Sequence, residues 1–380
     1  MSNRPRTRDL GIKIGNLEPG KWNAITDVPG IRVGHSTIIE GKGKLVPGTG
    51  PIRTGCTAIW THGGDMYLEK VTSTVHRING FGEVTNAEQI HEMGFIEGPI
   101  MITNTFNVAR VADAVMDWHL ARNDRMGAET WGVSPIVAET SDAYLNDIRG
   151  RHVAREHVFH AIDSARDGAV EEGAVGGGTG MTCYEFKGGI GTSSRKIPEN
   201  LGGYTVGALV QSNFGLRSQL MIDGVPVGKE LLDYGGRARR ASDPARDKQS
   251  KSIIVVVATD APCSYRQLNR LATRAHNGLA RTGSHSGNTS GDFVIAFSTT
   301  RRKYANNDKH VVTVEQIVET TDLISYLFWA VVEATEEAVL NSLFKSETMI
   351  GRDDRVAHAL PIEETVEIMK KYGHHGVHNP

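Results

Sequence analysis

The hydrophobic pattern is strongest in the C-terminal third of the chain. The run Ser252–Asp260 (SIIVVVATD) is rich in β-branched residues and apolar at both even and odd positions. A strand with this pattern is apolar on both faces and has to be covered from both sides. We therefore expect it to lie in the interior of a sheet, with packed layers above and below.

A helical pattern follows this strand. Ser264 and Gln267 have the spacing of a capping box, which predicts a helix start. The apolar stripe of that helix consists of Leu268, Leu271, Ala272, Ala275 and Leu279. A strand over Asp292–Thr299, a long apolar helix over 322–344 and a polar-faced helix over 363–372 are expected after it.

The N-terminal two thirds carry weaker signals. Apolar residues at helical spacing predict a helix over Val108–Met116, and a polar-faced helix is expected over 157–166. Short buried strands are expected over 135–140 and 204–212. Residues 22–34 hold a Pro-Gly turn between short apolar pieces, which predicts a strand and hairpin. The polar, aperiodic segment 234–251 predicts an exposed linker that ends against the buried strand.

Composition narrows the function classes. The 380 residues include 42 Lys or Arg and 44 Asp or Glu, a formal charge of −2, without a long block of like charge. This balance argues against binding to nucleic acid or to an anionic membrane. The longest apolar runs, 253–258 and 326–332, are too short to cross a bilayer, and no apolar segment follows the N-terminal arginines. A cytoplasmic location is the expectation. Three widely spaced cysteines indicate reduced, buried thiols: Cys56, Cys183 and Cys263.

Several common site motifs are excluded. The run 176–180 (GGGTG) lacks the Gly-Lys-Ser/Thr of a P-loop, and His91-Glu92 lacks the second histidine of a zinc-protease helix. The run 283–287 (GSHSG) has histidine where a nucleophile elbow has serine. The three histidines after Gly373 are best interpreted as a solvated tail. No metal site is predicted.

Longer segments resemble one known family. They span nearly the whole chain in the family's order: WNAITDVPG (22–30), GGGTGMTCYEFKGGIGTSSR (176–195), LVQSNFG (209–215), KSIIVVVATDAP (251–262), SGDFVIAFST (290–299) and SETM (346–349). The chain resembles the L-aminopeptidase/D-amidase-esterase and β-peptidyl aminopeptidase family, whose members cut themselves before a serine.

The resemblance implies that Ser252 is the nucleophile. The chain would be a single domain over 1–380 that cleaves itself between Lys251 and Ser252, giving a larger subunit 1–251 and a smaller subunit 252–380. A serine hydroxyl needs a base at neutral pH, and an α-amine with a pKa of about 7.7 can serve as one. Cleavage would create that amine on the nucleophile itself. Relatives carry Gly or Asn before the nucleophile, so Lys251 departs from the pattern.

Four further site residues follow from the resemblance. Ser290 and Asp292 match the family's Ser-Gly-acid pair, which would bridge to the Ser252 hydroxyl and orient the amine. Asn213 matches the side-chain donor to the oxyanion, and Glu139 matches the carboxylate that receives the substrate's amino group. Without the resemblance, the favoured interpretations are a solvated strand start for Ser290 and Asp292 and a turn for Asn213, and a surface ion pair is a common role for a residue such as Glu139.

The resemblance also implies a fold and a reaction. The fold would be a four-layer α-β-β-α sandwich similar to N-terminal-nucleophile hydrolases but with different strand connectivity, assembled as a homotetramer of processed pairs. The enzyme would release the N-terminal residue of short peptides, amides or esters, with β-amino acid, small L-amino acid or D-alanyl substrates, through an acyl-enzyme and without a metal or organic cofactor. An acyltransferase of the ornithine acetyltransferase type and an uncleaved, inactive scaffold are the alternatives.

Overall fold

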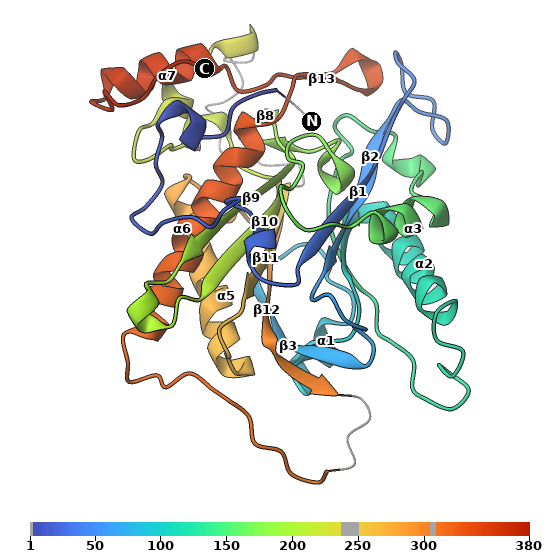
Figure 1. The fold of residues 1–380 in the computed structure, drawn as a ribbon. Coiled ribbons are helices and arrows are strands. Elements are labelled where there is room, and N and C mark those ends of the chain that lie inside the picture. Colours follow the sequence, from blue (N-terminus) through green and yellow to red (C-terminus); the bar gives the residue numbers. More distant parts are fainter. Residues whose placement is uncertain (1–2, 237–250, 305–308) are drawn as a thin grey trace.

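Two β-sheets stack face to face in the computed structural model, which describes residues 3–236, 251–304 and 309–380 (Figure 1). The four-stranded sheet has the order β1 (Arg32–Glu40), β2 (Ile52–Trp60), β5 (Ile100–Asn104) and β6 (Ile136–Thr140). The six-stranded sheet has the order β4 (Phe95–Ile96), β3 (Glu69–Gly80), β12 (Ser290–Tyr304), β11 (Lys251–Thr259), β10 (Thr205–Asn213) and β9 (Ile190–Lys196).

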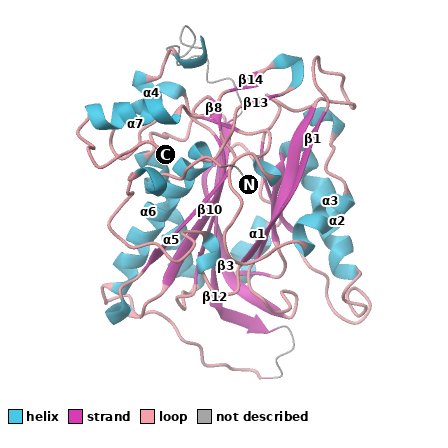
Figure 2. Cartoon of the chain, turned by 45° about the horizontal axis from the view of Figure 1, so that its top comes forward, coloured by secondary structure: helices cyan, strands magenta, loops and turns pink. Residues whose placement is uncertain are grey.

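Helices cover the outer face of each sheet (Figures 1 and 2). The helices α2 (Val108–Leu120) and α3 (Arg155–Asp163) pack on the four-stranded sheet, and α5 (Tyr265–Arg281) and α6 (Leu323–Phe344) pack on the six-stranded one. Shorter elements complete the described chain: α1 (Ala87–Met93), α4 (Val227–Glu230), α7 (Ile362–Lys371), the hairpin β7–β8 (Thr182–Cys183, Phe186–Lys187) and the hairpin β13–β14 (Met349–Ile350, Val356–Ala357). The predicted four-layer α-β-β-α sandwich is therefore confirmed.

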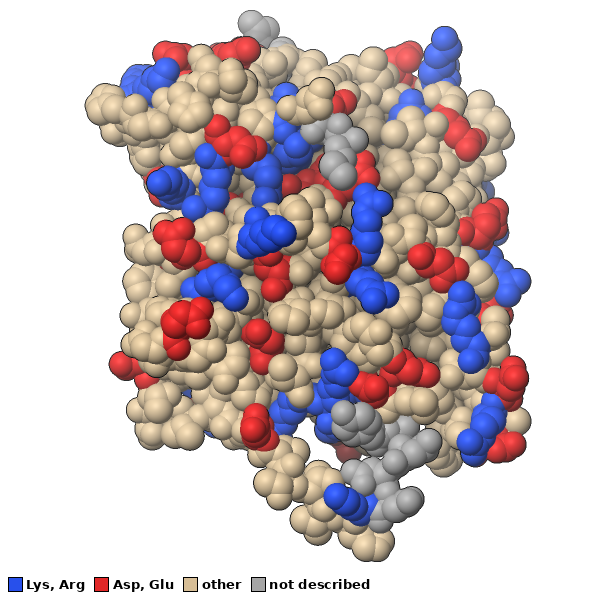
Figure 3. Space-filling view, in the orientation of Figure 1, with Lys and Arg blue, Asp and Glu red and all other residues tan. Residues whose placement is uncertain are grey.

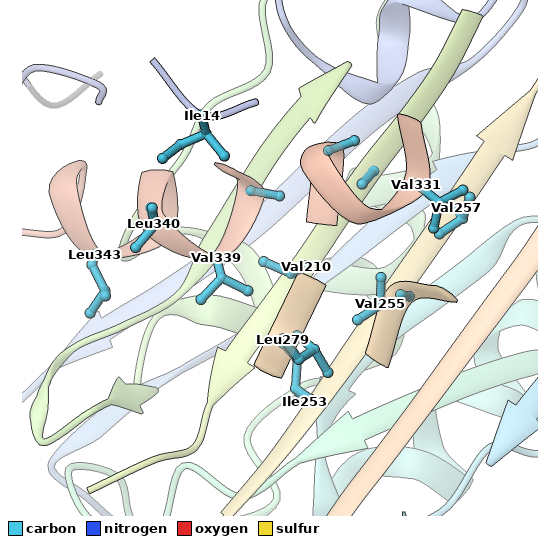
Figure 4. Packing of buried hydrophobic residues seen from close by; sticks show 14 of the residues in the cluster. Ile14, Val210, Ile253, Val255, Val257, Leu279, Val331, Val339, Leu340 and Leu343 are labelled. Atoms are coloured by element: carbon cyan, nitrogen blue, oxygen red, sulfur yellow. The ribbon is translucent and has the colours of Figure 1, made fainter. Parts of the chain in front are cut away.

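The strand β11 explains why the layers stack in this way. Its residues alternate between two apolar clusters, so that Ile254 and Val256 point between the sheets while Ile253, Val255 and Val257 point to the helices. Figure 4 shows the cluster on the helical side, in which α5 and α6 supply the side chains that face Ile253, Val255 and Val257. The sequence prediction of a strand covered on both faces is confirmed.

The predicted N-terminal hairpin is wrong. A 3₁₀ turn forms over Ile25–Asp27, and the strand begins only at Arg32. The carboxylate of Asp27 accepts hydrogen bonds from the N–H groups of Trp22 at 2.9 Å and Ala24 at 3.0 Å. Because these bonds close the chain into a compact turn, it cannot extend as a strand there.

A buried ion cluster joins the N-terminal segment and β9 to α6. The guanidinium of Arg195 contacts Glu333 at 3.0 Å and Glu337 at 2.6 Å, and all three side chains are fully buried. Arg8 contacts the other oxygen of Glu337 at 2.9 Å. On the surface, in contrast, charges of both signs are interspersed over the face drawn in Figure 3.

Candidate active site

Ser252 lies at the start of the buried central strand β11. The antiparallel neighbour β10 places Asn213 opposite it, and the parallel neighbour β12 places Gly291 beside it. Its side chain is enclosed, since Ser252 is 1% exposed, and the hydroxyl accepts a hydrogen bond from the Gly291 N–H at 3.2 Å. Most of the predicted linker, residues 237–250, lies outside the described part of the chain.

Ser290 and Asp292 form a hydrogen-bonded pair on β12. The Ser290 hydroxyl donates to Asp292 Oδ1 at 2.5 Å, and both side chains are buried. Burial raises the pKa of Asp292, while the bonds from the Ser290 hydroxyl and the Ile253 N–H act in the opposite direction. The predicted pairing of these two residues on one strand face is therefore present.

The strand register separates this pair from the Ser252 hydroxyl. Ser290 is the cross-strand partner of Lys251, and Asp292 is that of Ile253, so both side chains point to the α5 face. Ser252 points to the opposite face, between the sheets. In the uncut chain the pair lies beside the Lys251–Ser252 peptide bond. The Ser290 hydroxyl donates its one proton to Asp292, so it does not donate the predicted hydrogen bond to the Ser252 hydroxyl.

Asn213 is the last residue of β10, and its amide is held in a fixed orientation. The Nδ2 group donates to the Ser141 carbonyl at 2.9 Å, and Oδ1 accepts from the Thr182 N–H at 3.0 Å. The strand position excludes the turn interpretation of this residue. Because the amide nitrogen carries two hydrogens, the bond to Ser141 uses only one of them.

A tight hairpin holds the loop next to Asn213. This is the β7–β8 hairpin, whose turn residues Tyr184 and Glu185 have φ values of 50° and 60°. Residues other than glycine adopt such positive φ values only at a cost in backbone strain. The Tyr184 N–H donates to the Phe214 carbonyl at 2.6 Å, and the Tyr184 hydroxyl bonds to the Thr282 hydroxyl at 2.7 Å. These bonds connect the hairpin both to the strand that carries Asn213 and to the end of α5.

Glu139 lies on β6 of the other sheet and is 4% exposed, which excludes a surface ion pair. The Thr105 hydroxyl donates to its carboxylate. Burial raises the pKa of Glu139, while the bonds from Thr105 and the Glu83 backbone oppose this. A Cβ atom added to Gly82 would lie 3.0 Å from both Glu139 Oε1 and Gly291 Cα, so the carboxylate is close to the start of β12.

Sequence reasoning missed a buried acid near Glu139. Asp142 is fully buried and accepts bonds from the Thr54 hydroxyl at 2.6 Å, Asn104 Nδ2 at 2.8 Å and Asn146 Nδ2 at 3.0 Å. Burial raises its pKa to about 6, against these hydrogen bonds. Asp142 follows Ser141, the acceptor for Asn213, and therefore fixes the loop on which that amide depends.

The glycine-rich run 176–180 packs between the two sheets. A Cβ on Gly177 would lie 2.1 Å from Gln211 Oε1 and 2.8 Å from the Ile102 carbonyl, so only glycine fits. The buried Lys187 ammonium donates to the Gly178 carbonyl at 3.1 Å, and burial lowers the pKa of Lys187 to about 7. The predicted role of the run in backbone geometry agrees with these close approaches.

The segment 283–287 fits no nucleophile elbow, but its residues 284–287 line a small hollow beside Ser290. Phe214, Gln219 and Ser290 also line this hollow, whose volume of about 20 Å³ is the room of a single water molecule. Gln219 Nε2 and His285 Nδ1 lie within 2.9 Å across it. This hollow opens beside Ser290, on the helical side of β12.

Other predicted features can be located as well. Cys56, Cys183 and Cys263 are free and buried, and burial raises the pKa of Cys56 and Cys263 to about 12, which makes both thiols inert at neutral pH. His374 contacts Asp223 at 3.4 Å. Within the described ranges, no group of three or more His, Cys, Asp or Glu residues could hold a metal ion. Within the same ranges, no helix has the length and apolarity to span a bilayer.

The chain is similar to known proteins over nearly its whole length. The model of peptidase family S58 matches residues 23–357. The β-peptidyl aminopeptidase BapA of Sphingosinicella microcystinivorans is 44% identical over 378 residues, covering 97% of this chain and 92% of that protein.

Two solved structures share the fold. A protein of Pyrococcus horikoshii OT3 is 49% identical with a TM-score of 0.91, covering 97% of this chain and 100% of the other. The L-aminopeptidase D-Ala-esterase/amidase of Ochrobactrum anthropi, described as a new variant among the Ntn hydrolase fold, is 39% identical with a TM-score of 0.87, covering 98% of this chain and 99% of the other.

Proposed function

The chain belongs to peptidase family S58 and is an aminopeptidase, and we propose that Ser252 is its nucleophile, released by cleavage of the chain's own Lys251–Ser252 bond. The observation that carries this proposal is the placement of Ser252. It begins a central strand, faces Asn213 across the β10–β11 pair and points into the space between the sheets, toward the side where Glu139 lies.

Self-cleavage would proceed through an ester. The Ser252 hydroxyl attacks the Lys251 carbonyl carbon, the C–N bond to the Ser252 nitrogen breaks, and the hydroxyl proton ends on that nitrogen. Water then hydrolyses the ester, leaving a Lys251 carboxylate and a free Ser252 amine. The Ser290–Asp292 pair lies beside this bond and would stabilise the positive charge of the new amine.

Substrate hydrolysis would reuse the same atoms. The Ser252 amine accepts the proton of the Ser252 hydroxyl as the oxygen attacks the substrate carbonyl. The second N–H of the Asn213 amide donates to the oxyanion. One such donor stabilises the transition state by on the order of 3 kcal/mol. The proton passes to the leaving amine or alcohol, and a water molecule releases the acyl group.

The Glu139 carboxylate would select substrates with a free amine. It lies next to Gly82 and Gly291, within the inter-sheet space that Ser252 faces, and ion pairing there would hold the amino group of the N-terminal residue. The substrates are therefore short peptides, amides or esters with a free amino terminus. The candidates for the N-terminal residue of the substrate are β-amino acid, small L-amino acid and D-alanyl residues. The enzyme itself would be a cytoplasmic homotetramer of processed pairs.

The test is the intact mass of the purified protein under denaturing conditions. Two fragments, ending at Lys251 and beginning at Ser252, are expected for the unchanged sequence, and one full-length chain is expected for Ser252→Ala. Cleavage at the same bond in Ser252→Ala would reject the nucleophile. A single uncut and inactive chain of the unchanged sequence would favour the scaffold alternative, and acyl transfer without hydrolysis would favour the acyltransferase.

A further inference from the structure

A second cavity lies at the other end of the four-stranded sheet from Glu139. The cavity residue Trp60 is the last residue of β2, and its neighbour Ile59 pairs with the first residue of β5. Glu139 pairs instead with Thr103, near the last residue of β5. The cavity has a volume of about 200 Å³ and is partly open to solvent. It is therefore distinct from the space around Ser252, and its function is independent of the proposed peptidase chemistry.

The cavity holds one buried polar group without a partner. His119 lines the cavity and is 2% exposed, and neither of its ring nitrogens has a hydrogen-bond partner among the described residues. Burial lowers the pKa of His119 to about 4, so the ring is neutral at pH 7 and offers one N–H donor and one bare nitrogen acceptor. A ligand in the cavity that carries a polar group can therefore bond to this ring.

The walls around His119 are apolar ring surfaces. Trp60 and Trp118 meet edge to face with their centroids 5.8 Å apart. Both indole N–H groups are already used, Trp60 by the Ile162 carbonyl at 2.9 Å and Trp118 by Asp163 at 2.8 Å. The buried Met66 adds a third apolar wall.

The charges near the cavity are already engaged. The Arg122 guanidinium stacks on the Trp118 ring at 4.2 Å and contacts Asp163 at 3.0 Å. Asp65 Oδ1 accepts from the N–H groups of Tyr67 at 2.9 Å and Leu68 at 3.2 Å. Since the stacked guanidinium also repels a second cation at Trp118, the environment suits a neutral ligand.

We propose that this cavity binds a small neutral aromatic molecule that carries one hydroxyl or amide group. The ring lies against Trp60, Trp118 and Met66, and the polar group bonds to the His119 imidazole. The size agrees, because an apolar cavity of about 150 Å³ accepts benzene. A hydroxyl or amide can both donate and accept, so it can bond to one ring nitrogen whether that nitrogen is the bare acceptor or carries the N–H.

The test is a titration of the full-length protein with 4-fluorobenzyl alcohol, followed by ¹⁹F NMR. We expect saturable binding with a Kd on the order of 1 mM, as typical for so few heavy atoms. His119→Leu should weaken it at least tenfold, whereas His119→Gln, which keeps a donor and an acceptor, should restore it. The control probe 4-fluorotoluene, without the hydroxyl, should bind His119→Leu as well as the unchanged protein. Equal affinity of the alcohol for all three proteins would overturn the proposal.

Two further variants secure the result. Asn123 is half-buried and lines the cavity, so Asn123→Trp should fill it and abolish binding while His119 remains. This variant decides the outcome if His119→Leu does not fold, because unchanged binding would place the probe elsewhere. Ser252→Ala should bind the probe normally. Loss of binding in that variant would place the probe in the peptidase site and reject the second site.

Discussion

Ser252 and Asn213 are direct cross-strand partners in the antiparallel β10–β11 pair. Side chains at such positions have Cβ atoms about 4.5–5.5 Å apart. The Asn213 amide cannot rotate freely, because Ser141 and Thr182 bond to its two ends. If Ser252 is the nucleophile, as proposed, the carbonyl that it attacks would lie next to a preoriented donor, and this pair is the part of the site most open to a direct test.

Asn213→Ala should lower kcat of the processed enzyme by about 10²–10³-fold with a smaller change in KM, because the donor acts on the oxyanion formed in the transition state. The measurement is steady-state hydrolysis of an aminoacyl p-nitroanilide. Intact mass should be recorded first, so that slow processing is separated from slow turnover. A loss below tenfold in fully processed protein would mean that another group binds the oxyanion.

Glu139→Gln should reduce kcat/KM for substrates with a free amine by roughly ten- to a hundredfold, because one charge-assisted contact is lost. Self-cleavage should be unaffected, since the peptide there carries no free amine. N-acetylation of the substrate should produce a similar loss in the unchanged enzyme. Equal turnover of free and acetylated substrates would reject Glu139 as the amine receptor.

Asp292→Asn should move the acid limb of the kcat/KM–pH profile to lower pH. A carboxylate beside the Ser252 amine raises the pKa of that amine, and burial lowers it, so removal of the charge leaves the lowering effect alone. Activity should fall as well, because Ser290 loses its acceptor. An unchanged limb in fully processed Asp292→Asn would restrict Asp292 to a structural role.

Glu337→Gln should destabilise the protein by about 3–5 kcal/mol, because it removes the carboxylate that pairs with Arg8 and leaves the fully buried Arg195 with Glu333 alone. Burial alone would raise the pKa of Glu337, but the two guanidinium groups hold it below its ordinary value. The stabilisation is therefore present at neutral pH and lost as pH falls through that lowered pKa. Denaturant unfolding at pH 7 and at a series of values from about pH 5 to about pH 2 measures both effects.

Glu367→Gln is the matched control for this prediction. Glu367 pairs with Lys370 at 3.1 Å on the surface, where its side chain is 66% exposed. Solvent screens such a pair, so its loss should change the free energy of unfolding by less than about 1 kcal/mol. A similar loss in both variants would show that the buried cluster has no special role.

The sequence predicted best those elements whose signals are local. The helix α5 begins where the Ser264 capping box placed it, and the Ser264 hydroxyl accepts from the Gln267 N–H at 3.3 Å. The β-branched run of β11 was equally clear. The 3₁₀ turn near Trp22 was mispredicted because a single aspartate, Asp27, outweighs the strand preference of the apolar residues around it.

The site was predictable only as a set of residues. The resemblance named Ser252, Asn213, Glu139, Ser290 and Asp292, but their arrangement depends on the register of non-adjacent strands. The pairing of Ser290 with Lys251, which turns the Ser290–Asp292 pair away from the Ser252 hydroxyl, has no sequence signal. Asp142 was missed for the same reason, because two of its three donors, Thr54 and Asn104, come from distant segments.

The strand order of the six-stranded sheet would couple the proposed self-cleavage to folding. β11 and β12 would belong to the proposed smaller subunit, and strands of the larger one flank them on both sides, β3 beyond β12 and β10 beyond β11. The nucleophile and its neighbours come together only after both flanking strands have paired. If the chain cuts itself as proposed, a molecule that misfolds or stops short of this pairing would keep its peptide bond and gain no amine. Peptidase activity would then arise only in molecules that have finished folding.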